Sequence, residues 1–320
     1  MPTVREFLEK IKFAGSVDFD EPMSRRTTFR IGGPADAVVE PGTRESLAAL
    51  LYAARSAGLP VFLLGGGANL LVRDGGIRGL VVSTRGLDRL RKTGSGMEAE
   101  AGVLVTDLVK AAADEGLSGI EFAAGLPGSI GGAVYMNARC YEREFADLMT
   151  RVDFLAPDGS FGSLVPDRDE WAYKRTPFMP GGRLSGSVVL GAEFRLTPGG
   201  REAIRSRMRE LEADRAAKGH FDFPCAGSVF KNNRRFGRPT GKILDELGFR
   251  GRSLGTAAVS EKHANIFVNP GSATASDMLA LIDAARREAR DRFGYELEPE
   301  VVIIGEDGRE DSNDRTQATD

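Results

Sequence analysis

The sequence holds few of the residues that build disulfides or metal sites. Its 320 residues include two cysteines, Cys140 and Cys225, and two histidines, His220 and His263. Two cysteines can form at most one disulfide, and so low a cysteine content fits a reducing compartment. Two histidines argue against a multi-histidine metal centre, so we expect no metal.

The sequence also lacks long apolar runs and a strong charge imbalance. No stretch approaches the length of a membrane span, and the charged, amphipathic N-terminus has no apolar segment like that of a signal peptide. The formal net charge is −3, with 28% charged and 41% hydrophobic residues. This balance gives no electrostatic reason to expect nucleic acid or a membrane surface as a partner. We therefore expect a cytoplasmic protein.

Glycine, by contrast, is abundant, and it is densest in one stretch. Residues Gly119 to Asn137 read GIEFAAGLPGSIGGAVYMN, and Glu121 is the only charged residue among them. Dense glycine in apolar surroundings indicates that another chain segment, or a flat or phosphorylated ligand, presses on the backbone. Ser129 can cap a short helix whose free N–H groups would attract phosphate. A tightly packed buried turn is the alternative interpretation.

A second glycine cluster follows a short apolar strand. The strand, Val61 to Leu64, runs directly into Gly65-Gly66-Gly67-Ala68-Asn69. Backbone N–H groups at such a position can face an anion. The cluster matches neither a Walker loop nor the dinucleotide-binding glycine pattern, and taken alone it is a weak signal.

Helices and strands are mixed without regular alternation, which predicts an α+β fold. We expect helices over 3–13, 43–58, 103–114, 201–218 and 274–289, and strands over 35–39, 61–64, 79–83, 87–91, 97–101, 149–156, 161–164, 187–196, 264–268 and 300–304. Residues 173–178 are expected to be extended. The best boundary is Pro198-Gly199-Gly200. We therefore expect a lead-in over 1–26, domains over 27–197 and 198–305, and a polar, disordered tail over 306–320.

Seven segments taken together resemble one enzyme family. They are TTFRIGGPA (27–35), LGGGANLLV (64–72), GLPGSIGGAVYMNA (125–138), AYKRTPF (172–178), AGSVFKN (226–232), HANIFVN (263–269) and LEPEV (297–301). One such motif is weak evidence, but seven occur here in the family's order. On them the chain is similar to the UDP-N-acetylenolpyruvoylglucosamine reductase (MurB) family. The segment between Phe178 and Ala226 is too short for the extra tyrosine loop, so it resembles the subclass lacking that loop.

The resemblance implies a two-lobed FAD-binding domain of the vanillyl-alcohol-oxidase type and a smaller α+β substrate-binding domain. It implies a monomeric oxidoreductase of peptidoglycan and cell-wall synthesis, and hence of cell shape and division. NADPH would reduce non-covalent FAD, and UDP-N-acetylglucosamine enolpyruvate would become UDP-N-acetylmuramate. The residues implied to hold FAD are Gly65, Gly66, Gly67, Ala68, Asn69, Leu70, Gly125, Pro127, Gly128, Ser129, Gly131, Gly132 and Asn137.

Two residues match the family's catalytic positions directly. Ser228 matches the proton donor, although a serine that merely ties a turn is the alternative. Glu300 matches the catalytic glutamate, with a surface glutamate at a strand edge as the alternative. An ionised carboxylate beside a developing enolate would be repulsive. We therefore predict that Glu300 is protonated or paired with a cation in the complex.

The third catalytic position departs from the family pattern. The family shows Tyr-Arg-x-Ser, whereas this chain has Tyr173-Lys174-Arg175-Thr176. Neighbours on an extended segment face opposite ways, so we expect one cation to reach the enolate. Alignment favours Lys174, and the bidentate fit of a guanidinium to a carboxylate favours Arg175. We prefer Lys174.

Three further matches concern the substrate, and a second departure from the family pattern concerns the flavin. Tyr173, Lys231 and Asn232 match substrate-contacting positions, with turn chemistry and a solvated lysine as the alternative for the last two. Arg139-Cys140 is a second departure, because many family members have Gly-Ala there. A bulky residue at this point would alter the edge of the flavin site.

Two other functions remain open from the sequence. A flavoenzyme of the same fold that oxidises an alcohol or hydroxy acid would share the glycine stretches, but has no reason to carry 226–232 together with 297–301. A non-catalytic paralogue that binds a nucleotide sugar is favoured only by Lys174, and the intact Ser228 and Glu300 argue against it.

Overall fold

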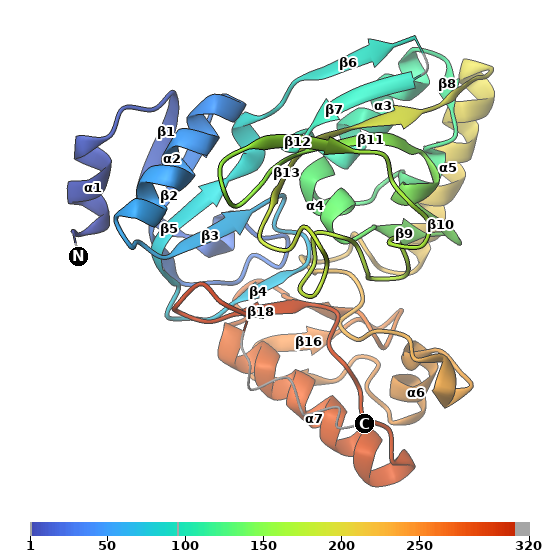
Figure 1. The fold of residues 1–320 in the computed structure, drawn as a ribbon. Helices are drawn as coiled ribbons and strands as arrows, with labels where there is room; N and C mark the ends of the chain where they lie inside the picture. The colour runs from blue at the N-terminus through green and yellow to red at the C-terminus, as the bar shows by residue number, and fades with distance from the viewer. Residues whose placement is uncertain (1, 95, 311–320) are drawn as a thin grey trace. The chain divides into compact units, whose positions relative to one another are not determined.

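The computed structural model describes residues 2–94 and 96–310 (Figure 1). By its contacts the chain divides into two compact units. Unit 1 comprises Met1–Asp18, Val38–Gly66 and Val81–Ala213, and unit 2 comprises Phe19–Ala37, Gly67–Leu80 and Asp214–Asp320. This division is not linear along the chain, and the expected domain limits at 26/27 and 197/198 stay a prediction.

Unit 1 is built on a five-stranded antiparallel sheet (Figure 1). Its spatial order is β12 (Phe161–Leu164), β11 (Met149–Leu155), β13 (Val188–Arg195), β7 (Gly96–Glu100) and β6 (Leu90–Thr93). Side chains alternate between its faces, as a strand requires. Met97 and Ala99 are buried in the core, whereas Glu98 pairs with Arg151 and Glu100 with Arg44.

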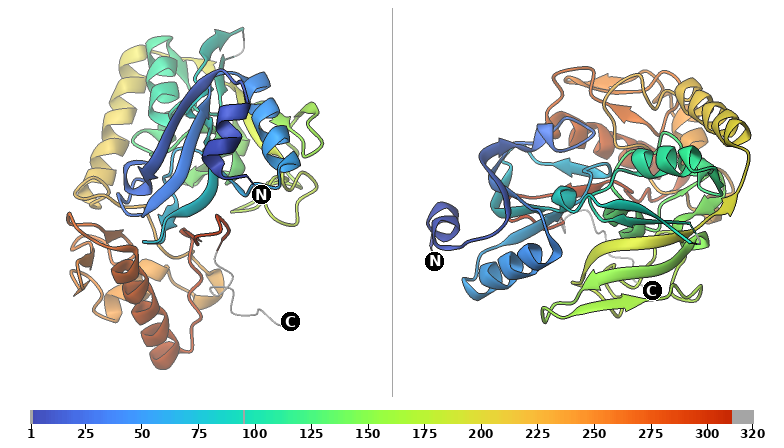
Figure 2. Two further views of the ribbon diagram at one scale, coloured as in Figure 1. Left: turned by 90° about the vertical axis from the view of Figure 1, so that its left-hand side faces the viewer. Right: turned by 90° about the horizontal axis from the view of Figure 1, so that it is seen from above.

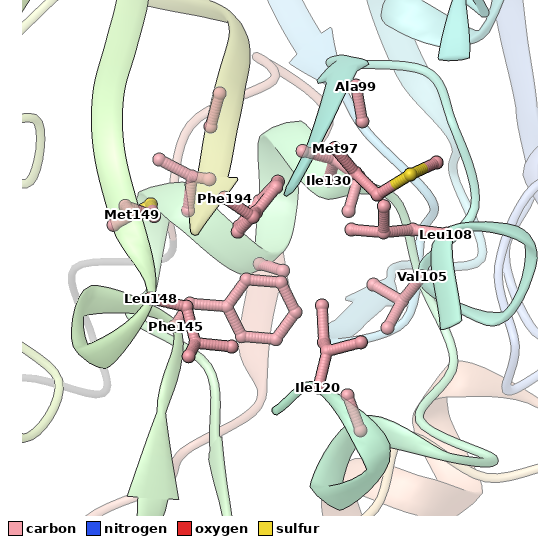
Figure 3. Close-up of a cluster of buried hydrophobic side chains, with 14 of the residues drawn as sticks. Met97, Ala99, Val105, Leu108, Ile120, Ile130, Phe145, Leu148, Met149 and Phe194 are labelled. Carbon is pink, nitrogen blue, oxygen red and sulfur yellow. The ribbon is translucent and has the colours of Figure 1, made fainter. Parts of the chain in front are cut away.

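The core of unit 1 fills one face of this sheet. Two helices beside it, α3 (Val105–Asp114) and α5 (Arg201–Ala217), run side by side in both ribbon views (Figures 1 and 2), and Arg205 of α5 donates to Asp114 of α3 at 2.8 Å. Figure 3 shows Phe145 and Phe194 inside the cluster, with Ile130 of α4 (Ile130–Tyr135) close by. The two phenyl rings meet edge to face, 5.8 Å between centroids, a favoured aromatic geometry.

A second sheet has the order β1 (Gly15–Pro22), β2 (Pro34–Pro41), β5 (Ile77–Ser83) and β3 (Val61–Leu64). Two helices of unit 1 are close to these strands in sequence. Helix α1 (Val4–Lys10) precedes β1, and helix α2 (Arg44–Ser56) lies between β2 and β3. Thr43 caps α2 by accepting from the N–H of Ser46, which satisfies a donor that the first helical turn leaves open. Two-stranded pairs complete unit 1: β8 (Leu117–Ser118) with β14 (Thr197–Pro198), and β9 (Arg139–Cys140) with β10 (Arg143–Glu144).

Unit 2 has its own core and its own small sheets. Strands β15 (Ser253–Leu254), β16 (Ala257–Val259) and β17 (Phe267–Val268) are antiparallel, and β4 (Leu70–Val72) pairs in parallel with β18 (Val302–Ile304). The helices are α6 (Thr240–Glu246) and α7 (Ala275–Phe293). Val229, Phe230, Phe267 and Leu281 lie in the buried cluster.

The N-terminus of α7 is closed by a carboxylate from a distant segment. Asp74 accepts from the N–H groups of Ala275 at 2.7 Å and Ser276 at 2.9 Å, and Thr274 accepts from the N–H of Asp277. A helix leaves these donors without intrahelical partners. Asp74 and Thr274 together therefore satisfy the first turn of the longest helix of unit 2.

Several sequence expectations differ from the structure in detail. A 3₁₀ turn, Thr84–Gly86, precedes β6, so the strand expected over 87–91 begins at Leu90. The strand expected over 264–268 is reduced to β17. The tail expected to be disordered from residue 306 begins with a turn, in which Glu310 bridges to Ile304. Residues 311–320 lie outside the described residues. In the described ranges, no helix is both long and apolar enough to cross a membrane.

Candidate flavin cradle and catalytic residues

The two glycine stretches meet inside unit 1. A Cβ on Gly66 would lie 2.5 Å from both the Cα of Gly128 and the N of Ser129, and one on Gly65 would lie 2.9 Å from Ser129 Oγ. Real Cβ atoms do not approach backbone this closely, so only glycine fits at position 66. The glycine density therefore reflects, in part, one chain segment pressing on the other.

Ser129 occupies the N-cap position of α4, as expected, but it does not cap the helix. Its hydroxyl makes no cap hydrogen bond and has no partner among the described residues, and the residue as a whole is 1% exposed. The N–H groups of Ile130 and Gly131 donate instead to the carbonyls of Val103 and Ala101, at 2.8 and 2.9 Å. The expectation that these N–H groups are free is therefore wrong, because a neighbouring loop already satisfies them.

An unpartnered, buried hydroxyl is costly and calls for a partner that the protein does not supply. Around Ser129 Oγ the wall is made of glycine, and a Cβ on Gly132 would meet only that hydroxyl, at 3.8 Å. Nearby, Gly125 and Gly128 take positive φ angles of 69° and 105°, which glycine alone adopts readily. A close-approaching ligand with hydrogen-bonding groups, such as a flavin dinucleotide, fits this cradle.

The remainder of the cluster at 65–69, from Gly67 onward, belongs to unit 2. Gly67 takes a φ of 65°, and a Cβ there would overlap the carbonyl of Arg26. Asn69 donates its side-chain N–H to the carbonyl of Glu300 at 2.8 Å. Ala68 precedes Asn69 in a turn, and Leu70 pairs with Val302. Asn69 therefore holds the backbone of the predicted catalytic glutamate, and a cofactor contact by 67–70 stays a prediction.

Asn137 links two loops of unit 1. It is fully buried, its Oδ1 accepts from the N–H of Ala146 at 3.0 Å, and its Nδ2 donates to the carbonyl of Ala172 at 3.2 Å. Its φ of 45° lies in the left-handed region, which asparagine tolerates better than most residues. The side chain thus serves the protein scaffold, and its predicted cofactor contact is untested. Pro127 and Gly125 lie in the turn before α4.

The segment with the predicted cationic residue is a tight turn, and the expected extended conformation is wrong. Ala172 and Arg175 exchange backbone hydrogen bonds of 3.0 and 3.1 Å. Lys174 between them takes a φ of 54°, an uncommon conformation for a lysine. The Arg175 guanidinium donates a hydrogen bond from Nη2 to the carbonyl of Asp169 at 2.8 Å. Lys174 Nζ lies 5.9 Å from the centroid of the Tyr173 ring.

Ser228 and Glu300 lie on adjacent segments of unit 2. The N–H of Glu300 donates to the carbonyl of Val229 at 2.6 Å, and Phe230 bridges to Pro299. Both predicted catalytic residues are half-buried. The backbone thus brings together two positions that are 72 residues apart in sequence.

A buried asparagine that the sequence analysis did not single out fixes the serine segment. Asn265 is 2% exposed. Its Oδ1 accepts from the N–H of Phe230 at 3.0 Å and its Nδ2 donates to the carbonyl of Phe230 at 2.8 Å. Its backbone carbonyl accepts from Val229. The signal for this residue is an amide between the apolar residues Ala264 and Ile266 of HANIFVN, because a buried amide must find partners.

The two predicted phosphate or sugar contacts are engaged by the protein. Lys231 pairs with Glu298 at the protein surface, so the alternative of a solvated lysine does not describe it fully. Asn232 accepts from the N–H of Thr240 at 2.9 Å, at the start of α6. Such a contact satisfies a helix N-terminus. Asn232 therefore has turn chemistry, and its substrate contact stays a prediction.

Cys225 is buried, and both histidines are half-buried. Burial lowers the pKa of His220 to about 4 and also lowers the pKa of His263, so both are neutral at pH 7. Burial raises the pKa of the Cys225 thiol, which makes it a poor nucleophile. Over residues 2–94 and 96–310, no group of three or more His, Cys, Asp or Glu side chains could hold a metal ion.

Two protein-family models match the chain. One is described as FAD binding domain and matches residues 35–163. The other is described as UDP-N-acetylenolpyruvoylglucosamine reductase, C-terminal domain, and matches residues 219–304. The first model spans Gly65, Gly66 and Ser129, and the second spans Ser228 and Glu300.

Relatives of known name are similar over nearly the whole chain. A Rubrobacter xylanophilus protein named UDP-N-acetylenolpyruvoylglucosamine reductase is 43% identical over 289 residues, covering 90% of this chain and 95% of the relative. A Treponema denticola protein of the same name is 38% identical over 307 residues, covering 92% and 95%. The crystal structure of the Thermus caldophilus enzyme of this name superposes with a TM-score of 0.74 at 31% identity, covering 91% of this chain and 99% of that one.

Proposed function

Because the chain belongs to the UDP-N-acetylenolpyruvoylglucosamine reductase family, we propose that it reduces the enolpyruvyl ether of UDP-N-acetylglucosamine to UDP-N-acetylmuramate. The reductant is NADPH, and the product is a precursor of peptidoglycan. The structural observation that carries the proposal is the pairing of the Ser228 and Glu300 segments, which Asn265 and Asn69 hold from either side. We further propose that the enzyme acts in the cytoplasm as a monomer.

The FAD-binding domain supplies the cofactor site. Ser129, with its unpartnered hydroxyl, and the glycines around it would hold the dinucleotide. The remaining residues of this proposed site are Gly65, Gly66, Gly67, Ala68, Asn69, Leu70, Gly125, Pro127, Gly128, Gly131, Gly132 and Asn137. When bound, FAD supplies the redox chemistry by accepting a hydride from NADPH and delivering one to the enolpyruvyl carbon. The protein must then position the substrate and manage the charge and the proton.

Ser228 and Glu300 are proposed to manage the proton. Hydride addition to the double bond builds negative charge on the pyruvyl group, in the form of an enolate, and the neighbouring carbon takes up a proton. The Ser228 hydroxyl holds that proton, because an enolate is basic enough to take it from an alcohol. Glu300, protonated or paired with a cation, avoids repulsion at the developing charge.

Lys174 is proposed to stabilise the enolate. Arg175, the alternative, is supported less, because its guanidinium already donates to the carbonyl of Asp169. The left-handed conformation of Lys174 favours the same choice, since strained backbone concentrates at functional sites. Tyr173, Lys231 and Asn232 are proposed to contact the substrate.

The test is NADPH oxidation by the purified holoenzyme, followed with and without UDP-N-acetylglucosamine enolpyruvate. We expect oxidation that depends on the substrate and yields UDP-N-acetylmuramate. Oxidation that is independent of the substrate would favour a different flavoenzyme of this fold. Purified protein without the yellow flavin spectrum, even after incubation with FAD, would contradict any flavoenzyme function.

A further inference from the structure

Two cations gather at one aromatic ring in unit 1. Arg139 Cζ and Lys174 Nζ each lie 5.9 Å from the centroid of the Tyr173 ring. This distance is within the range of a cation–π interaction, which orients a guanidinium or ammonium group without neutralising its charge. Tyr173 is 41% exposed and Arg139 is exposed. The arrangement therefore presents positive charge at an accessible site.

Arg139 stands on a rigid support. It is the first residue of β9, and the β9–β10 turn has two consecutive residues at positive φ, Tyr141 at 50° and Glu142 at 62°. This is the geometry of a tight two-residue hairpin. The Tyr141 hydroxyl donates to the carbonyl of Leu211 at 3.0 Å, and Cys140 Sγ donates to the carbonyl of Phe122 at 2.8 Å.

The hairpin and the lysine turn are also tied to each other. Asn137, two residues before Arg139, donates to the carbonyl of Ala172 and accepts from the N–H of Ala146. Ala172 begins the turn that carries Tyr173 and Lys174. One buried amide thus sets the position of both cations, and pre-organisation of this kind lowers the cost of binding a ligand.

Neighbouring cations in unit 1 are used within the protein, whereas Arg139 has no carboxylate partner among the described residues. Arg175 donates to the carbonyl of Asp169, and Arg143 packs on the Phe122 ring with 5.4 Å to its centroid. The Arg139 guanidinium lies over the Tyr173 ring. Its guanidinium therefore keeps its donors available for an external anion.

We propose that Arg139 binds the carboxylate of the enolpyruvyl substrate, beside Lys174. This inference rests on the proposed function. A guanidinium binds a carboxylate with two parallel hydrogen bonds, whereas a lysine ammonium acts as a point charge. Position 174 carries lysine where the family carries arginine. Arg139 supplies the bidentate donor that position 174 lacks. Arg139 then fixes the carboxylate, and Lys174 stabilises the charge that develops on it.

The test is equilibrium binding to the oxidised holoenzyme by calorimetry, with two ligands. UDP-N-acetylmuramate carries the carboxylate, and UDP-N-acetylglucosamine carries the same diphosphate without it. Loss of a charge-assisted bond corresponds to about a tenfold to hundredfold change in affinity. We expect Arg139→Ala to raise the Kd for UDP-N-acetylmuramate by that factor and Arg139→Lys to raise it less. The Kd for UDP-N-acetylglucosamine should stay unchanged.

Arg143→Ala, an exposed cation of the same hairpin, is the matched control and should bind both ligands normally. Three results would overturn the inference: an unchanged Kd in Arg139→Ala, an equal loss for both ligands, or the same loss in Arg143→Ala. If the wild-type enzyme turns over normally and Arg139→Ala leaves the Kd for UDP-N-acetylmuramate unchanged, this inference is refuted and the proposed function is not. A wild-type protein that binds UDP-N-acetylmuramate through Arg139 but does not reduce the enolpyruvyl substrate refutes the proposed function and supports the binding role.

Discussion

Replacing Gly66 by alanine tests how closely the two glycine stretches pack beside the proposed FAD site. The added Cβ would lie 2.5 Å from the Cα of Gly128 and the N of Ser129, and ordinary contact begins at 3.4 Å. The two segments must therefore separate by about 0.9 Å, and both neighbours are backbone that cannot rotate away. Overpacking of this kind costs about 1–3 kcal/mol of unfolding free energy. The displaced segment carries Ser129, so FAD binding should weaken as well.

Gly132→Ala is the comparison variant in the same cradle. Its Cβ would meet only Ser129 Oγ, at 3.8 Å, and alanine favours a helix over glycine by about 1 kcal/mol. We expect the apoprotein to be as stable as wild type or more so, and FAD affinity to fall, because the new methyl group occupies the cradle.

The assay compares urea unfolding of the apoprotein with the flavin-to-protein absorbance ratio after reconstitution. Gly66→Ala should lower both quantities, and Gly132→Ala only the second. If Gly66→Ala were as stable as wild type and bound FAD equally well, the close approach of the two glycine stretches would be refuted. If Gly132→Ala kept full FAD affinity, the cradle beside Ser129 would not be the cofactor site.

Three other predictions concern single residues. Lys174→Ala should lower kcat by at least about tenfold, whereas Arg175→Ala should keep most turnover; the reverse order would assign the role to Arg175. Burial lowers the pKa of His220 to about 4, so between pH 6.5 and 4 the unfolded state binds more protons than the folded state. The free energy of unfolding should therefore fall as the pH is lowered from 6.5 towards 4, and denaturation of His220→Asn should show a flatter decline over this range. Phe145→Ala should cost about 3–5 kcal/mol in the same measurement, and a cost below about 1 kcal/mol would contradict its central place in the core.

Elements with strong local signals could be predicted from the sequence. Thr43 caps α2 and Thr274 caps α7, as the pattern of a polar cap before an apolar stripe indicates. The strands expected over 149–156 and 161–164 form as β11 and β12, which pair in antiparallel around Pro157-Asp158-Gly159. These features depend on neighbours in sequence, so the pattern of residue types is enough to identify them.

Features set by distant contacts could not be read from local patterns. The tight turn at Lys174 was missed, because nothing in Tyr-Lys-Arg-Thr demands a left-handed lysine; Asn137 holds the turn from 35 residues away. The N–H group of Ile130, expected to be free, donates to the carbonyl of Val103. A local helix signal cannot reveal such a contact with a distant segment. The two-residue strands β15 and β17 are too short for a periodic signal.

The parallel pairing of β4 with β18 has a consequence for biosynthesis. Leu70 to Val72 find their partners only at Val302 to Ile304, so this ladder cannot form until more than 230 later residues have left the ribosome. Closing a loop of that length before any contact forms makes folding slow. The glutamate segment next to Ser228 lies just before β18. The proposed catalytic pair therefore assembles only after Glu300 has left the ribosome, and a nascent chain would bring Gly66 against Gly128 before it can perform the reaction.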